Sequence, residues 1–136
     1  MKKTLLFVAL VAVGASLYWF SPGPDGPFED YYENGQLETN GTWKDGGFDG
    51  PHEMYYDNGQ LMSKTTFKDG VQEGLWETYH ENGQLDWKRT YKDGERDGPY
   101  ESYLEDGQLR SKGTYKDDEK CGEWMEEGET VTYDPC

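Results

Sequence analysis

One 24-residue unit repeats along most of this chain, and this period constrains the fold more than any other feature. Successive units begin at Asp25, Asp49, Glu73, Asp97 and Cys121. The fourth unit reads DGPYESYLEDGQLRSKGTYKDDEK, and the first three differ from it mainly by exchanging one aromatic or polar residue for another. Such periods are typical of arrays in which each unit packs against its neighbours. We therefore predict four complete repeats over residues 25–120 and a shortened terminal unit over 121–136.

Every repeat carries a strong turn signal near its middle. The pairs are Asn34-Gly35, Asn58-Gly59, Asn82-Gly83 and Asp106-Gly107, and such pairs favour the two-residue type I′ turn of a β-hairpin. A second turn (DGGF, DGVQ and DGER in the first three copies) is expected to be a longer loop with a permissive glycine. Since one hairpin is only marginally stable alone, we predict an all-β fold in which the hairpins join into one elongated antiparallel sheet.

The predicted reversal at Asn-Gly divides the residues between two faces, because residues directly opposite in a hairpin share a face. In the second repeat it places Tyr56 opposite Leu61, His52 opposite Thr65 and Gly50 opposite Phe67. The predicted apolar face then has three columns: Phe28, His52, Trp76, Tyr100 and Trp124; Leu37, Leu61, Leu85 and Leu109; and Trp43, Phe67, Tyr91 and Tyr115. The last column lies opposite Gly26, Gly50, Gly74 and Gly98, and we expect these rings to cover exposed backbone there.

The other predicted face is charged. Opposite charges are expected to meet at Glu53–Lys64, Glu77–Lys88 and Glu101–Lys112, and at the hairpin base at Asp25–Lys44, Asp49–Lys68, Glu73–Lys92 and Asp97–Lys116. A tyrosine column shares this face, and it is the candidate binding surface: Tyr31, Tyr55, Tyr79 and Tyr103. The alternative is that these rings pack against their neighbours and only stabilise the sheet.

No catalytic residue, metal ligand or cofactor site is predicted. His52 and His80 occupy columns where other copies carry Phe, Trp, Tyr or Leu, so we interpret them as substitutes for those side chains. The repeated glutamates have lysine partners in three of four copies, and no EF-hand spacing is present. The marked breaks in the repeat are Trp87-Lys88-Arg89 and the end piece CGEWMEEGETVTYDPC. We predict that the chain is not an enzyme.

The N-terminal segment indicates export. Residues 1–20 contain Lys2 and Lys3 followed by 17 uncharged residues, which is the form of a signal peptide or a short helical membrane anchor. Cleavage before Ser16 and retention as an inner-membrane anchor both stay open, and residues 21–24 form a short linker. The repeats are expected in the periplasm or another extracytoplasmic space.

Cysteine content and charge agree with that location. Cys121 and Cys136 are expected to form a disulfide that closes the terminal hairpin, since exported chains meet an oxidising compartment. Two thiols without a nearby histidine fall short of a zinc site. The chain carries −15 overall and, without Lys2 and Lys3, −17. We therefore predict no nucleic-acid partner, and membrane contact only through residues 4–20 if this segment is not cleaved.

The pattern G-x-[aromatic]-x-x-Y-x-x-N-G-Q-L, seen in GLWETYHENGQL, resembles the bacterial variant of the MORN repeat from Asp25 to about Tyr133. The resemblance implies an elongated hairpin array used for protein or lipid contact, and some bacterial members are labelled antitoxins. A cytosolic antitoxin would not need an export segment, and the negative charge disfavours lipid contact. We predict a non-enzymatic scaffold that binds an unidentified protein partner at the cell envelope. The alternatives are a tethered structural protein without a dedicated ligand and antitoxin-like partner binding.

Overall fold

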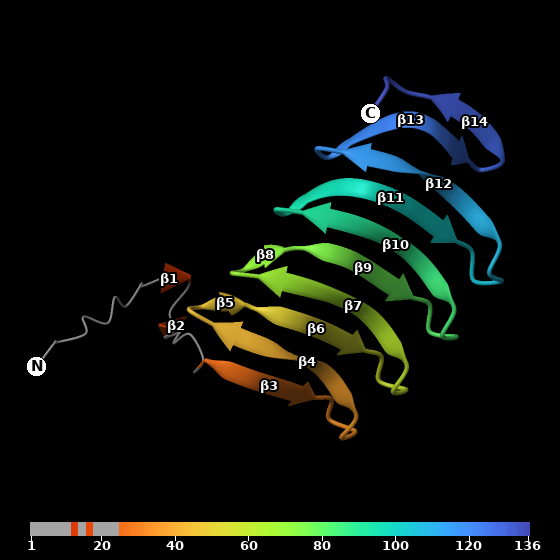
Figure 1. Ribbon diagram of the computed structural model, residues 1–136. Coiled ribbons are helices and arrows are strands. Elements are labelled where there is room, and N and C mark those ends of the chain that lie inside the picture. The colour runs from red at the N-terminus through yellow and green to blue at the C-terminus, as the bar shows by residue number, and fades with distance from the viewer. Residues whose placement is uncertain (1–11, 14–15, 18–24) are drawn as a thin grey trace, which may run out of the picture.

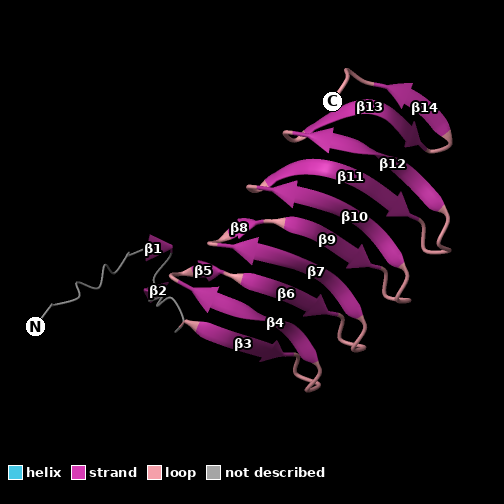
Figure 2. Cartoon of the chain, in the orientation of Figure 1, coloured by secondary structure: helices cyan, strands magenta, loops and turns pink. Residues whose placement is uncertain are grey.

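The computed structural model describes residues 12–13, 16–17 and 25–136, and its main body is a single antiparallel sheet of twelve strands (Figures 1 and 2). Two short strands, β1 (Ala12–Val13) and β2 (Ser16–Leu17), pair only with each other. The strands of the main sheet are β3 (Gly26–Tyr31), β4 (Leu37–Lys44), β5 (Gly47–Phe48), β6 (Gly50–Tyr55), β7 (Leu61–Lys68), β8 (Val71–Gln72), β9 (Gly74–Tyr79), β10 (Leu85–Lys92), β11 (Glu95–Tyr103), β12 (Leu109–Lys116), β13 (Glu119–Glu126) and β14 (Glu129–Thr132).

Strand order in the sheet follows chain order from β3 at one end to β14 at the other, except that the two-residue strands β5 and β8 lie off this path and pair with β4 and β7 (Figure 1). The predicted array of antiparallel hairpins is therefore confirmed. The predicted N-terminal helix and the linker at 21–24 fall almost entirely outside the described residues. Within the described ranges, no helix is long and apolar enough to span a membrane.

The two kinds of turn are the reverse of the sequence prediction. The two-residue type I′ turn lies at the second position, where Lys68 pairs with Val71 across Asp69 and Gly70. Both turn residues have positive φ, 49° and 81°, as this turn requires. The same conformation recurs at Asp45-Gly46, Asp93-Gly94, Asp117-Asp118 and Glu127-Gly128.

The Asn-Gly turn is instead a three-residue loop. Gly59 donates its N–H to the carbonyl of Tyr56 at 2.9 Å, and Tyr56 donates to the carbonyl of Gln60 at 2.8 Å. Only Gly59 has positive φ, 84°, which is the pattern of a type I turn followed by a glycine bulge. Asn58 does not adopt the left-handed conformation, because its side-chain oxygen accepts the N–H of Gln60 at 2.8 Å.

A β-bulge beside this loop moves the leucines to the other face. The predicted pairs hold from Gly50–Phe67 to Met54–Ser63, but Tyr55, not Tyr56, pairs with Leu61. Met62 is the extra residue, and the equivalent shift occurs in all four repeats. The placement of Leu37, Leu61, Leu85 and Leu109 on the apolar face was therefore wrong. They lie opposite the tyrosine column because the inserted residue reverses the alternation of side chains.

The other two predicted columns do meet on one face, which we call the aromatic face. Ring centroids of the two columns are 6.0 Å apart for Phe28 with Trp43, 5.6 Å for Trp76 with Tyr91 and 5.7 Å for Tyr100 with Tyr115. The strand glycines opposite the column of Trp43, Phe67, Tyr91 and Tyr115 are needed for their backbone conformation, and not for the ring contact that was predicted. Gly26, Gly50, Gly74 and Gly98 have φ between 82° and 132°, a conformation that residues with a Cβ rarely adopt.

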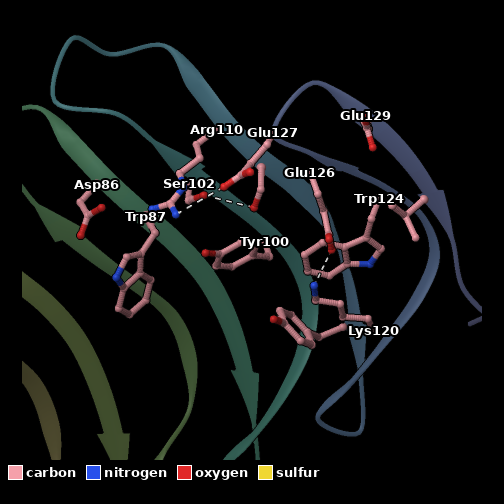
Figure 3. Close-up of a pocket in the computed structure, with 13 residues that line it drawn as sticks. Asp86, Trp87, Tyr100, Ser102, Arg110, Lys120, Trp124, Glu126, Glu127 and Glu129 are labelled. Carbon is pink, nitrogen blue, oxygen red and sulfur yellow. Dashed lines mark hydrogen bonds and ion pairs between the residues drawn. The ribbon is translucent and has the colours of Figure 1, made fainter.

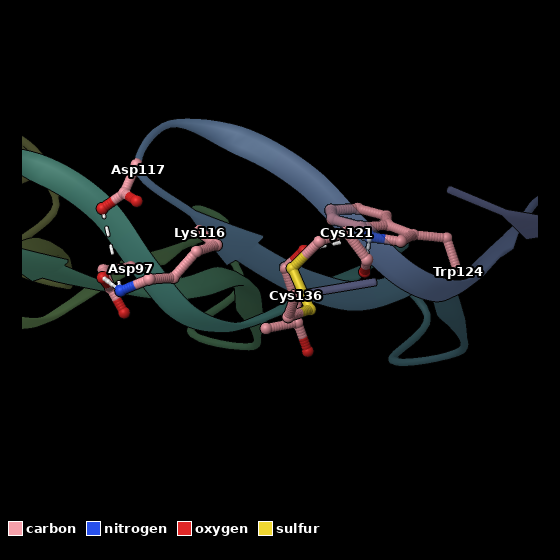
Figure 4. Close-up of a disulfide and its surroundings, with 7 residues drawn as sticks. Asp97, Lys116, Asp117, Cys121, Trp124 and Cys136 are labelled. Atoms are coloured by element: carbon pink, nitrogen blue, oxygen red, sulfur yellow. Dashed lines mark hydrogen bonds and ion pairs between the residues drawn. A yellow bond between two sulfur atoms is a disulfide. The ribbon is translucent and has the colours of Figure 1, made fainter. Parts of the chain in front are cut away.

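The C-terminal hairpin closes the array, and the predicted disulfide between Cys121 and Cys136 is present (Figure 4). Gly122 fixes the tail by donating its N–H to Asp134 at 2.8 Å and accepting from Tyr133 at 2.9 Å. The adjacent Trp124 is 1% exposed. Its indole N–H donates to the carbonyls of Thr114 and Cys121. The terminal hairpin therefore carries the most buried side chain of the core.

Candidate interaction surfaces

Several side chains that recur from repeat to repeat form hydrogen bonds to the next repeat. The Tyr56 hydroxyl donates to the carbonyl of Tyr79 at 2.8 Å, and Tyr32 does the same to Tyr55 at 2.7 Å. Asn34 and Asn82 donate their side-chain N–H to the carbonyls of Asp57 and Glu105 in the following loop. Sequence reasoning missed these contacts, and the signal that could have found them is the recurrence of Asn34, Asn58 and Asn82 at the 24-residue period. The side chains at these positions therefore hold neighbouring repeats together.

His80 fits this scheme. Its Nε2 lies 3.2 Å from the carbonyl of Tyr103, where Tyr56 places its hydroxyl in the preceding repeat. His52 instead packs among rings of the aromatic face, with its centroid 4.5 Å from that of Phe48. Burial there lowers the pKa of His52. Each histidine therefore occupies its column as a structural substitute, His52 by packing and His80 by hydrogen bonding.

The charged face forms a continuous ladder across repeats. The predicted opposite pairs are present in the backbone register, but Lys64 and Lys88 form their ion pairs with the glutamate of the next repeat. Lys112 lies opposite Met125 there. Lys64 lies 2.7 Å from Glu77, and Lys88 lies 2.8 Å from Glu101. In the first repeat Asn40 takes the lysine position and donates to Glu53 at 3.2 Å. These contacts join neighbouring hairpins, because Lys64 and Lys88 each stand between two glutamates in the sheet.

At the hairpin base only one predicted ion pair forms. Lys116 binds Asp97 (Figure 4). In the first three repeats the acid caps the type I′ turn instead: Asp25, Asp49 and Glu73 accept the backbone N–H of Asp45, Asp69 and Asp93 at 2.8, 3.1 and 2.9 Å. The predicted pairs of these three acids with Lys44, Lys68 and Lys92 are therefore wrong. The backbone amide is a fixed donor, whereas a long lysine side chain loses entropy when it pairs.

The predicted tyrosine column lies on the charged face. Tyr55, Tyr79 and Tyr103 donate their hydroxyls to the glutamates two residues earlier, at 2.7, 3.2 and 2.6 Å, and Tyr31 makes the same contact with Glu29. The acceptor carboxylate raises the pKa of Tyr55 and Tyr103, and burial raises that of Tyr79. The hydroxyls are thus engaged within the chain, while the rings flank the ladder. Use of this column as a binding surface stays a prediction.

The aromatic face is hollowed near its C-terminal end (Figure 3). We call this open cavity of about 650 Å³ the aromatic hollow. One row of the register crosses it, from Trp87 through Ser102 and Ser111 to Glu126. The two serines bond each other at 3.2 Å, and Ser102 is 7% exposed. Small side chains between large ones leave the space open.

The walls of the hollow combine rings with charged groups. Tyr100 and the buried Trp124 stack with centroids 5.6 Å apart. Four acids and two bases line the hollow: Asp86, Glu126, Glu127 and Glu129, with Arg110 and Lys120. Lys120 is bound to Glu126 (Figure 3). Among the described residues, no three His, Cys, Asp or Glu side chains are grouped so that they could hold a metal ion.

Comparison with known proteins agrees with the repeat geometry. The profile of the MORN repeat variant matches residues 24–45, 48–69, 72–93 and 96–117. No curated protein shows a significant match to the chain. The matched segments span the four complete hairpins and leave the terminal hairpin outside.

Proposed function

This chain belongs to the MORN repeat variant family, and from that premise we propose that it is a non-enzymatic scaffold that binds a protein partner. One observation carries the proposal: the sheet is a single layer. Among the described residues, nothing packs over either face, and aromatic side chains such as Trp87 and Tyr100 stay partly exposed. A soluble protein rarely leaves such surface open unless it serves an interaction.

We place the scaffold outside the cytoplasm, in the periplasm or at the outer side of the inner membrane. The apolar segment 4–20 and the disulfide between Cys121 and Cys136 support this location, because disulfides persist mainly in oxidising compartments. Thiol labelling in cells tests it. Both cysteines should resist a maleimide until a reductant is added, and labelling without reductant would contradict the location.

Site-directed photo-cross-linking in the full chain tests the binding function. A benzophenone side chain would replace Tyr79 on the charged face or Trp87 on the aromatic face, with Glu33, exposed in the first loop, as the control. We expect a discrete protein adduct from at least one face and none from Glu33. The absence of adducts from both faces in intact envelopes would refute the scaffold proposal.

The same assay separates the two faces. If the adduct comes from the charged face, replacing Tyr55 and Tyr79 together by alanine should abolish it, since the partner would contact the tyrosine column. If that double variant captures the partner unchanged, the tyrosine column is not the binding surface.

A tethered structural element is the second candidate, and the apolar N-terminal run favours it. Cell fractionation distinguishes it from a released scaffold. A tether requires the chain to stay in the membrane fraction with residues 1–20 attached. A soluble form that begins at Ser16 or later would exclude the tether and leave the binding function intact.

A further inference from the structure

The aromatic hollow lies where the two breaks of the repeat meet. One wall is Trp87, from the irregular Trp87-Lys88-Arg89 segment, whereas Ser63 and Ser111 hold the same position in the second and fourth repeats. The far wall is Trp124 and Glu126 of the terminal hairpin. A feature that regular stacking does not require, built from both irregular segments, is a candidate for specific recognition.

This face already holds the chain's own cations against its rings. The Arg89 guanidinium lies 4.0 Å from the ring centroid of Trp87, and that of Arg96 lies 4.3 Å from Tyr115. Lys120 Nζ lies 4.5 Å from Trp124. These distances are within the range of cation–π attraction. The rings that line the hollow are Trp87, Tyr100, Tyr115 and Trp124. Of these four, Tyr100 is the one over which no cation of the described residues lies.

The charge of the walls favours a cation in that position. Four acids against two bases leave the lining with a net charge of −2. Glu126 is bound to Lys120, and Glu127 lies 3.8 Å from Arg110. The two acids of the lining without a lysine or arginine partner are Glu129, exposed at the turn between β13 and β14, and Asp86, which stands beside Trp87 at the opposite side (Figure 3). A cationic group on Tyr100 would therefore have carboxylates on both sides.

We propose that the aromatic hollow binds an arginine side chain of a basic protein segment, with its guanidinium against Tyr100. Arginine fits better than lysine because its planar group stacks on rings and donates to carboxylates at the same time. A hollow of about 650 Å³ also has room for residues that flank the arginine. The inference rests on the proposed function and specifies the chemistry of the partner.

Titration of the full chain with acetyl-hexaarginine amide tests this, at about 150 mM salt so that diffuse attraction is screened. Calorimetry on the wild type should show saturable binding, and hexalysine should bind more weakly. In the Trp87→Ser variant the affinity for hexaarginine should fall about tenfold. This variant is expected to fold, since two other repeats carry serine at that position.

Trp43→Leu is the matched control, because it also removes a tryptophan from the aromatic face at the same net charge, but in the first repeat and outside the hollow. Its affinity should stay at the wild-type value. Equal losses in both variants, or no loss in Trp87→Ser, would show that the peptide binds by overall charge and would overturn the proposal. Amide chemical shifts give a second measurement: peptide-induced changes should centre on Tyr100 and Ser102, and a scatter over both faces would contradict the site.

The two proposals can fail separately. If hexaarginine binds at the hollow but no protein is cross-linked, the proposed arginine site is supported and the scaffold function is refuted. A protein adduct from Tyr79 alone, with no effect of Trp87→Ser, would support the scaffold and refute the hollow as its binding site.

Discussion

Gly113 should be the least replaceable glycine for steric reasons. It lies directly beneath Trp124, and a Cβ at position 113 would stand 2.1 Å from Cδ2 and 2.2 Å from Cε2 of the indole. The ring would have to move by more than about 1 Å, because favourable carbon–carbon separations begin near 3.5 Å. Trp124 is 1% exposed, and its N–H donates at 3.1 Å and 3.2 Å to two carbonyls, so a displacement of the ring would strain or break these hydrogen bonds.

We expect Gly113→Ala to lower the free energy of unfolding by about 3 kcal/mol. Overpacking costs about 1–3 kcal/mol, and the displaced indole donor adds about 1–3 kcal/mol if its hydrogen bonds break. The lower chain entropy of alanine returns about 0.5–1 kcal/mol. Urea denaturation followed by circular dichroism measures the change as a shift of the midpoint at constant slope.

Gly41→Ala is the control for this prediction, since Gly41 holds the same position in the first repeat. A Cβ there would lie 2.9 Å from the Phe28 ring and 3.0 Å from the His52 ring, and both side chains are partly exposed and can move aside. We expect a cost below about 1 kcal/mol. In a Trp124→Leu background the cost of Gly113→Ala should largely vanish. An unchanged cost in that background, or a cost below about 0.5 kcal/mol in the wild type, would refute the reasoning.

Three further predictions concern the cap, the repeat contacts and the charged ladder. Reducing the bond between Cys121 and Cys136, which are 15 residues apart, should destabilise the chain by about 3 kcal/mol in urea denaturation. Tyr56→Phe should cost about 1 kcal/mol in the same assay, because it removes one hydrogen bond to the next repeat. The Lys88 ion pair and the Tyr103 hydroxyl lower the pKa of Glu101, so their stabilisation is present above its ordinary pKa and is lost as pH falls through the lowered one. Lys88→Met should flatten the acid limb of the stability–pH curve, and an unchanged limb would exclude this ladder as its source.

Much of the fold follows from the sequence, because the 24-residue period and the strand pattern constrain each other. The backbone register from Gly50 to Met54 is as predicted. The errors come from turn chemistry. Asn-Gly is compatible with a type I′ turn, but Asn58 also accepts the N–H of Gln60, and this local bond favours the three-residue loop. The bulge at Met62 then displaced the leucines. Neither effect leaves a periodic signal that distinguishes it from the simpler hairpin.

The candidate surfaces were harder to predict for a related reason. Side chains that recur along the array attract attention, yet the structure uses them internally: Tyr55 binds Glu53, Tyr56 binds the next repeat and Lys64 joins two hairpins. A periodic side chain has the same neighbours in each copy, so its polar groups are satisfied by the array itself. Recognition of one particular partner needs a place where the pattern changes. In this chain that place is the hollow between Trp87 and the terminal hairpin, where a tryptophan replaces serine beside a pair of small residues. The positions that depart from the repeat are therefore better guides to binding than those that obey it.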